Sequence, residues 1–397
     1  MRTTIKILLV MLLLCSVLGA AVYLDNHHGL VDLPQKTQAE LFAEAEKQAP
    51  TVPQTTVAET TGAVPAAAVE TTPETESAEA EAETEPAQQR FQLTFVGDCT
   101  LGANPTNYYA GVGFIKTVGE DYGYPFRNVL SYLESDDATF ANLEGALTDT
   151  GNPADKTHTF RGPASYGRIL TQNSVDVVTL ANNHSFDYGQ TGYDSTRAVL
   201  DEAGIPYVER DSSRLVTLEC GLKVGLYGTV YFSFDQEDMK AEIAQLREQG
   251  AELVIVAAHW GTEGTYHPTE EQTQLGHAAI DAGADIVWGS HPHVLQPIEE
   301  YNGGVIYYSL GNFCFGGNGS PDDMDTALLQ QEVIRDAQGK VSLGTLKIVP
   351  CSVSSVADRN NFQPTPLTVG SEEYNRALSK LEGTFTGSDL KIHKIAK

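Results

Sequence analysis

Basic residues are scarce in this chain. Its 397 residues include 25 Lys and Arg against 53 Asp and Glu, which gives a formal net charge of −28 at pH 7. A nucleic-acid backbone binds to basic patches, so this balance argues against nucleic acid as a partner. An acidic chain is compatible instead with metal cations or with a basic partner.

Cysteines are also few and far apart along the chain. The five residues, Cys15, Cys99, Cys220, Cys314 and Cys351, show neither the number nor the spacing of a disulfide framework or a zinc knuckle. Cys220 and Cys351 both lie in strand-like segments and could form one disulfide, but free buried thiols are the preferred interpretation. For Cys99 and Cys314 we expect core packing.

Only one long apolar run is present, and it lies at the amino terminus. Residues 7–24 are uncharged and mostly apolar, and Arg2 and Lys6 precede them. This pattern predicts that residues 1–34 form an uncleaved membrane anchor that places the rest outside the cytoplasm. The alternative is a cleaved signal peptide and a secreted protein.

Bulky apolar residues are rare between residues 35 and 90, where Ala, Thr, Pro and Glu dominate. Such a segment buries too little apolar surface to offset the entropy lost on ordering, so we interpret it as a disordered acidic spacer.

From residue 91 onward, apolar runs alternate with helical patterns, which predicts an α/β domain over residues 91–316. Thr269 and Gln272 form a capping box at the start of one helix. A carboxy-terminal extension, residues 317–397, is expected to complete the domain with antiparallel strands and a tail. The predicted strands are residues 91–96, 175–180, 223–227, 253–257, 285–288, 305–310, 325–334 and 340–355; the other predicted helices are residues 126–134, 192–203 and 238–249.

Polar side chains follow many of these strands at the point where each strand ends. They are Asp98, Glu144, Asn183, His184, His259, His291 and His293. In open α/β sheets this edge binds ligands. Each residue alone has an ordinary explanation as a turn, cap or surface residue. Together, their mixed nitrogen and oxygen donors predict one or two divalent ions, with Mn, Zn or Fe favoured.

The motifs that contain these residues resemble, in order, those of the CapA family of capsule synthesis proteins. The resemblance implies an α/β fold like that of the calcineurin-like metallophosphoesterases, a four-layer α/β/β/α sandwich with its metal site at one edge of two sheets. The motifs are Gly97 to Gly102, Tyr124 to Phe126, Asn142 to Glu144, Ala181 to Gly189, His259 to Gly261, Gly289 to His293 and Ser309 to Phe313.

The same resemblance implies roles for individual residues. His184 takes the position of the catalytic imidazole, and Asp187 either orients it or caps a helix. Glu263 fits the pattern as well, with a solvated loop carboxylate as the alternative. The implied metal ligands are Asp98, Glu144, Asn183, His259, His291 and His293.

The chain departs from the phosphoesterase pattern at two positions. Thr100 stands where a histidine ligand is usual, and Glu144 replaces a bridging aspartate. Arg161 is the candidate for binding an anionic substrate, because guanidinium pairs with carboxylate or phosphate through two bonds. The alternative for Arg161 is a surface ion pair.

The function implied by the resemblance is synthesis, attachment or export of an anionic capsule polymer such as poly-γ-glutamate, and the predicted anchor places this function outside the cytoplasm. If the chain is an enzyme, the expected reaction is metal-dependent hydrolysis. The expected partners are the polymer and membrane polymer-synthase subunits. The alternative is a non-catalytic subunit that binds the polymer or the synthase and keeps a structural metal.

Overall fold

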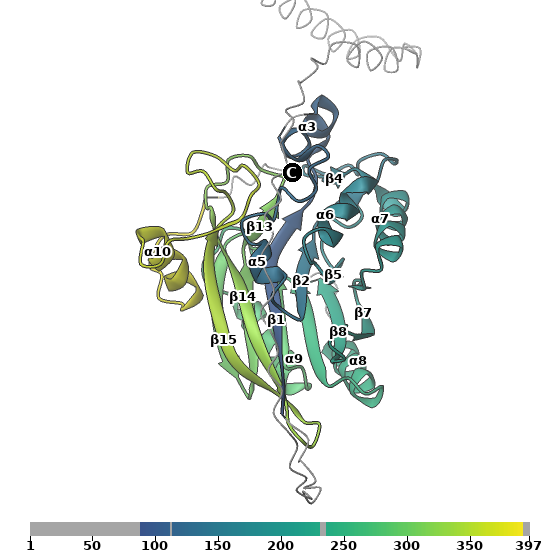
Figure 1. Ribbon diagram of the computed structural model, residues 1–397, viewed down its shortest axis with the longest axis vertical. Helices are drawn as coiled ribbons and strands as arrows, with labels where there is room; N and C mark the ends of the chain where they lie inside the picture. Colours follow the sequence, from purple (N-terminus) through teal and green to yellow (C-terminus); the bar gives the residue numbers. More distant parts are fainter. Residues whose placement is uncertain (1–87, 112, 231–235, 392–397) are drawn as a thin grey trace, which may run out of the picture. The chain divides into compact units, whose positions relative to one another are not determined.

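The computed structural model describes residues 88–111, 113–230 and 236–391 (Figure 1). The predicted anchor and the predicted spacer up to residue 87 lie outside these ranges. Within them, no helix combines the length and the apolar character needed to cross a bilayer.

Two large sheets form the centre of the fold. The first has the strand order β16, β15, β14, β1, β2, β5, β6, and β13 pairs with β1 as well. Its strands are β1 (Gln89–Thr100), β2 (Ala138–Leu143), β5 (Val177–Thr179), β6 (Tyr207–Val208), β13 (Asn312–Phe315), β14 (Asp325–Arg335), β15 (Val341–Ser352) and β16 (Thr365–Pro366).

The second sheet has the order β11, β12, β10, β9, β8, β7. Its strands are β7 (Ser212–Thr217), β8 (Lys223–Val230), β9 (Leu253–His259), β10 (Ile286–Ser290), β11 (Leu295–Tyr301) and β12 (Gly304–Leu310). A separate short pair joins β3 (Ala146–Leu147) to β4 (Arg161–Gly162).

The central strands of each sheet run parallel. In the first sheet β1 is parallel to β2 and β13, and in the second β10 is parallel to β9 and β12. Parallel strands bring their carboxyl ends to one edge of a sheet, which is the arrangement that the sequence predicts for the site.

An aromatic core fills the space between the two sheets. Phe95 of β1 lies with its ring centroid 5.0 Å from Phe140, 5.8 Å from Trp288 and 5.5 Å from Tyr307. All four side chains are buried. Trp288 and Tyr307 belong to the second sheet, so burial of these rings holds the two sheets face to face.

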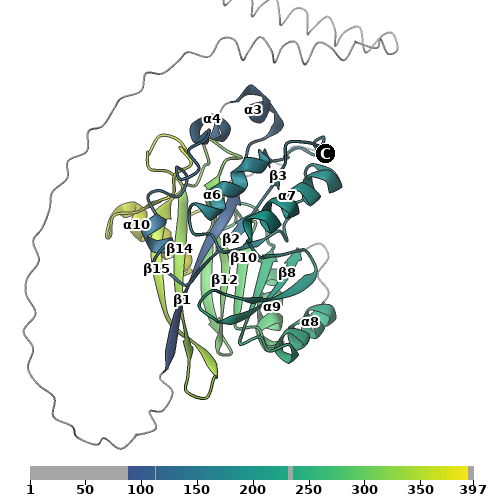
Figure 2. The same cartoon turned by 45° about the vertical axis from the view of Figure 1, so that its right-hand side comes forward.

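Helices cover the outer face of each sheet (Figures 1 and 2). On the first sheet lie α4 (Phe114–Val118), α5 (Leu130–Leu133), α6 (Gly167–Thr171) and α7 (Gly189–Ala203), and on the second α8 (Gln236–Glu248) and α9 (Glu270–Asp281). The layers therefore follow the order helix, sheet, sheet, helix. The remaining helices are α3 (Pro105–Ala110), the 3-10 helix η2 (Ala164–Tyr166) and α10 (Glu372–Leu381).

Most predicted elements are found, with changed boundaries. The capping box of α9 is confirmed: Thr269 Oγ1 accepts from Gln272 N at 3.2 Å, and Gln272 Oε1 accepts from Thr269 N at 3.0 Å. Free thiols are confirmed for Cys99, Cys220, Cys314 and Cys351, so the alternative disulfide between Cys220 and Cys351 is absent.

The predicted helix at residues 126–134 is wrong over its first half. Only Leu130–Leu133 is α-helical, and the preceding segment makes tight turns in which Val129 N donates to Phe126 O at 2.9 Å. Phe126, Val129 and Leu133 are all buried. Tertiary burial of these side chains therefore selects turns where the apolar pattern indicated a continuous helix.

Candidate metal centre

Segments that are distant in the sequence deliver their polar side chains to one edge of the two sheets. Asp98 lies opposite Asn142 in the parallel pairing of β1 with β2, and Ser290 lies opposite His259 in the pairing of β10 with β9. Two groups of possible ligands result, Asp98 with Glu144 and His293, and Glu263 with His291 and His293; in each, the ligand atoms lie within 4.8 Å of one another.

Asp98 and Glu144 form the fully buried part of the site. His293 Nδ1 lies 3.1 Å from Asp98 Oδ2, and His293 Nε2 lies 3.8 Å from Glu144 Oε1. Asn142 Nδ2 donates to Asp98 Oδ1 at 2.9 Å and to Glu144 Oε2 at 3.3 Å. This amide orients both carboxylates, while Glu144 Oε1 has no hydrogen-bond partner among the described residues.

The buried carboxylates of Asp98 and Glu144 favour a nearby positive charge. Burial and the neighbouring Asp98 carboxylate raise the pKa of Glu144 well above its ordinary value. Burial lowers the pKa of His293, but Glu144 and Asp98 outweigh it and raise that pKa to about 10. Two carboxylates removed from water are stabilised by a proton on His293 or by a divalent ion. The proton and the ion therefore compete for the group formed by Asp98, Glu144 and His293.

His259, His291 and Asn183 lie beside this group. His259 Nδ1 is 2.8 Å from Ser290 Oγ, and His259 Nε2 is 3.0 Å from Asn183 Oδ1. The ring centroids of His259 and His291 are 4.7 Å apart. Burial lowers the pKa of His259 and, together with His293, lowers the pKa of His291 to about 4. Both imidazoles are therefore neutral at neutral pH, the form that binds metal.

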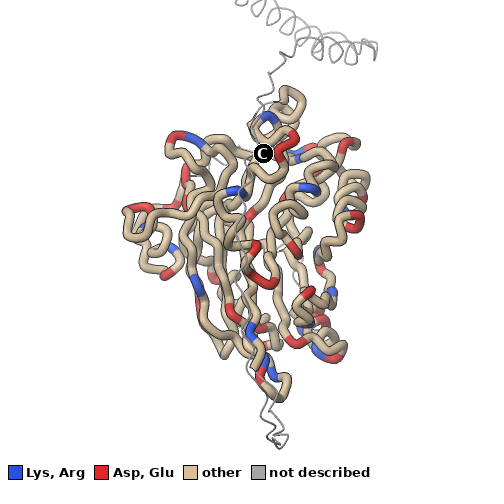
Figure 3. The backbone as a smooth tube through the Cα atoms, in the orientation of Figure 1, with Lys and Arg blue, Asp and Glu red and all other residues tan. Residues whose placement is uncertain are grey.

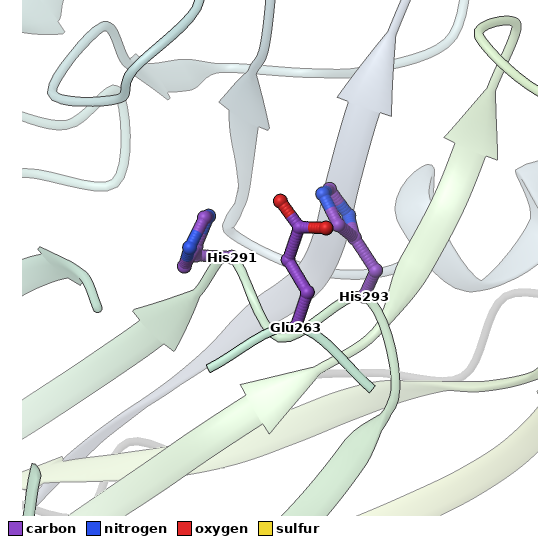
Figure 4. A group of neighbouring side chains, drawn as sticks. All are labelled: Glu263, His291 and His293. Carbon is purple, nitrogen blue, oxygen red and sulfur yellow. The ribbon is translucent and has the colours of Figure 1, made fainter. Parts of the chain in front are cut away.

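Figure 4 shows the second group of possible ligands, in which the Glu263 carboxylate lies beside the His293 ring and His291 stands across from them. The turn that carries the two histidines is strained, since His291 has φ 96° and His293 has φ 57°. Non-glycine residues in the left-handed region cost on the order of 1–3 kcal/mol each and cluster at functional sites. His291 Nδ1 is buried and has no hydrogen-bond partner within residues 88–111, 113–230 and 236–391.

These donors fit a divalent transition metal. Carboxylate oxygens and imidazole nitrogens converge in the two ligand groups, and the Asn183 amide oxygen contacts His259 beside them. Two of the buried atoms that could bind a metal, Glu144 Oε1 and His291 Nδ1, have no hydrogen-bond partner in the part of the chain that is described. Thr100 is buried too, and its Oγ1 also has no partner.

His184 and Asp187 form a hydrogen-bonded pair at the rim of the site. His184 Nδ1 lies 2.7 Å from Asp187 Oδ2, which also accepts from Phe160 N at 2.5 Å. His184 Nε2 lies 3.8 Å from Glu144 Oε1. No side chain caps helix α7, so Asp187 orients the imidazole rather than serving as the cap. Burial lowers the pKa of His184, and the bond to Asp187 opposes that shift.

Lys156 completes this rim and was not anticipated from the sequence. Its ammonium group forms an ion pair with Asp187 Oδ1, donates to Asn183 O at 2.9 Å and lies 3.4 Å from His184 Nδ1. Lys156 lies in the loop before β4, where no strand pattern marks it. Asn142 and Asn312 stand in the recognised motifs, but nothing in those motifs indicated that they orient ligands. Asn312 Oδ1 accepts from His293 Nδ1 at 2.9 Å.

The Arg161 guanidinium contacts tyrosine rings rather than the candidate metal ligands. Its guanidinium carbon stands 4.2 Å from the ring centroid of Tyr108, 4.9 Å from Tyr188 and 5.3 Å from Tyr109. The residue is only 5% exposed, so the alternative of a surface ion pair is wrong. The Arg161 Nε atom has no hydrogen-bond partner in the described part of the chain, and anion binding by Arg161 stays a prediction.

A family model described as Bacterial capsule synthesis protein PGA_cap matches residues 92–317. PGA biosynthesis protein CapA of Bacillus subtilis (strain 168) is 29% identical over 322 residues, covering 75% of this chain and 82% of that protein. Capsule biosynthesis protein CapA of Bacillus anthracis is 30% identical over 305 residues, covering 68% of this chain and 72% of that protein. Among solved structures, NAD nucleotidase of Haemophilus influenzae overlaps with a TM-score of 0.39 at 13% identity, covering 75% of this chain and 56% of that one.

Proposed function

The chain belongs to the PGA_cap family of bacterial capsule synthesis proteins, and from this we propose that it acts in the synthesis, attachment or export of an anionic polymer such as poly-γ-glutamate, at a site that holds one or two divalent metal ions. The observation that carries the proposal is the convergence of Asp98, Glu144 and His293 at the edge of the two sheets, with a buried donor atom unsatisfied. All three lie within the matched residues.

Both ligand groups contribute to the proposed centre. Asp98, Glu144 and His293 would hold an ion in the buried part, while His291 and Glu263 extend the donor set toward the exposed part. Mixed nitrogen and oxygen donors favour Mn, Zn or Fe. When bound, such an ion supplies Lewis-acid stabilisation of negative charge on an ester or amide oxygen.

His184 is the residue of this chain that would move a proton. In its neutral form Nδ1–H donates to the Asp187 carboxylate, so Nε2, on the side of Glu144, is free to accept a proton. The carboxylate then stabilises the imidazolium, which can protonate a leaving group. Lys156 and Phe160 N hold Asp187 in place, so the imidazole keeps its orientation.

The charge of the molecule restricts where a polyanion can bind. Lys and Arg segments are scattered singly among Asp and Glu along the described chain (Figure 3), and the net charge is −28. A polyanion is therefore repelled by most of the surface, within a screening length of about 8 Å at physiological salt. Contact with such a polymer would be concentrated at local cations, namely the metal centre, Lys156 and Arg161.

The proposed setting is outside the cytoplasm, with residues 1–34 as a membrane anchor and membrane polymer-synthase subunits as partners. The apolar run at residues 7–24 after Arg2 and Lys6 supports the anchor. We also propose that the fold is of the metallophosphoesterase type, which the helix, sheet, sheet, helix layering supports.

A non-catalytic subunit that binds the polymer or the synthase is the second candidate. Thr100 favours it, because a hydroxyl with no partner stands where phosphoesterases place a histidine ligand. Loss of that ligand removes a donor from the first metal and argues against the two-metal chemistry of the phosphoesterases.

His184→Ala in the full-length protein separates the two candidates. If the chain is an enzyme, we expect unchanged metal content and melting temperature but a loss of polymer production or phosphodiester hydrolysis of about 10²–10⁴-fold, the usual contribution of a general acid. His277→Ala is the matched control, because His277 pairs with Glu299 on the surface of α9. Wild-type polymer yield in His184→Ala would favour the binding subunit.

A further inference from the structure

The carboxy-terminal segment returns to the loop that carries Glu263. The family match ends at residue 317, yet the chain continues through β14, β15 and helix α10 to residues 382–391. We call this last stretch the strap. Its backbone meets the loop of residues 261–266 directly after Glu263.

Two hydrogen bonds join the strap to this loop. Leu390 N donates to Gly264 O at 2.9 Å, and Tyr266 N donates to Asp389 Oδ1 at 2.9 Å. On its other side, Gly264 N donates to Pro292 O at 2.8 Å, and Pro292 separates the two histidines of the strained turn. The loop is thus fixed between the strap and the turn that supplies His291 and His293.

A buried charge cluster anchors the strap. Lys380 Nζ, at the end of α10, donates to Asp323 Oδ2 at 2.6 Å and to Asp325 Oδ2 at 2.7 Å, and the residue is 2% exposed. The same ammonium group stands over the rings of Tyr266, at 4.7 Å, and Phe385, at 5.2 Å. These two rings also contact each other edge to face at 4.8 Å.

The loop needs such an external contact, because its own backbone is permissive. Gly261 and Gly264 on either side of Glu263 have φ values of 83° and 72°, which glycine adopts at little energetic cost. Glu263 itself is exposed, so no surrounding side-chain packing holds its long side chain. A ligand in that situation binds a metal well only if neighbouring contacts fix it in advance.

We propose that the strap positions Glu263 as a metal ligand, with Asp389 as the positioning residue. This inference rests on the metal centre proposed above. It gives the segment beyond the family match a specific role at the site: residues from the end of the chain set the geometry of a donor located more than a hundred positions earlier.

Asp389→Ala tests the proposal, with Asp389→Asn as its matched control, because the asparagine keeps an oxygen that accepts from Tyr266 N. Zn²⁺ affinity is measured by chelator competition on the full-length protein in detergent. We expect Asp389→Ala to weaken Zn²⁺ binding about 10-fold, the lower end of the range for contacts that support a ligand, and Asp389→Asn to restore it.

Asp389→Ala and Asp389→Asn are also made in a Glu263→Gln background. This comparison separates an effect on the position of Glu263 from a general loss of order in the loop. If the strap acts through Glu263, Asp389→Ala has little further effect once that carboxylate is removed. An equal loss in both backgrounds, or no loss in either, overturns the inference while leaving the metal centre intact. A wild-type protein that binds none of Zn²⁺, Mn²⁺ and Fe²⁺ overturns the metal centre and, with it, the role of the strap.

Discussion

Two carboxylates outside the metal centre, Asp325 and Asp136, differ in how their charge is compensated. Asp325 is compensated by cations: burial raises its pKa, but the hydrogen bonds and charges of Arg376 and Lys380 outweigh this and lower it. Asp136 is half-buried and accepts hydrogen bonds from the hydroxyl groups of Thr94 and Thr139, and burial raises its pKa to about 7. The raised pKa of Asp136 makes the free energy of unfolding depend on pH up to neutrality.

Asp136→Asn should remove part of that dependence. Because the folded-state pKa of about 7 exceeds the ordinary value of 3.8, the folded protein binds more protons than the unfolded chain between these pH values. The free energy of unfolding therefore falls as pH rises through this window. We expect Asp136→Asn to be about 1–2 kcal/mol more stable than wild type at pH 8, allowing for the residual solvent contact of this side chain.

Thermal melts from pH 4 to pH 8 measure this effect. The surface substitution Asp201→Asn, on α7, is the control and should keep the wild-type slope. A wild-type slope in Asp136→Asn as well would contradict the assignment.

At the scale of elements, helix α9 covers part of the outer face of the second sheet, and its first turn depends on the Thr269 cap. Thr269→Ala leaves Gln272 N without its acceptor, and loss of such a cap typically destabilises a protein by about 0.5–2 kcal/mol. Thr269→Ser keeps the hydroxyl and should recover most of the stability. Chemical denaturation of the three proteins checks this, and equal midpoints would show that the cap contributes nothing.

The strands could be predicted because strands that are buried on both faces are nearly continuous apolar runs in the sequence. Residues 253–257 and 285–288 are apolar almost throughout, since both faces of β9 and β10 are covered. The helix predicted at residues 126–134 is shorter because tertiary packing of Phe126 and Val129 decides its local backbone, and periodicity does not record such packing.

The ligands could be predicted for a related reason. Parallel strands bring their ends together, so Asp98, His259 and His291 are marked by their positions after apolar runs. Lys156 has no such marker, because a long irregular loop brings it to His184. The approach of Asp389 to the Glu263 loop depends on the path of α10, which the local sequence does not specify.

At the scale of the whole molecule, the acidic amino-terminal stretch and the folded region are expected to behave differently. We predict that limited proteolysis of the full-length protein leaves a resistant soluble fragment starting near Phe91, because the strands pack from that point onward. Intact protein should sediment with membranes. Recovery of the mature chain from the medium, beginning near Ala21, would contradict the anchor and support a cleaved signal peptide.

The central claim is that the strand ends form a metal centre, and elemental analysis of the purified protein tests it most directly. Full-length protein prepared without chelator in metal-replete medium should contain one or two equivalents of transition metal, as expected for the mixed donor set. Replacing both His291 and His293 by alanine removes donors from both ligand groups, so this variant should lose most of the metal. A wild-type protein that contains no transition metal under these conditions would contradict the account.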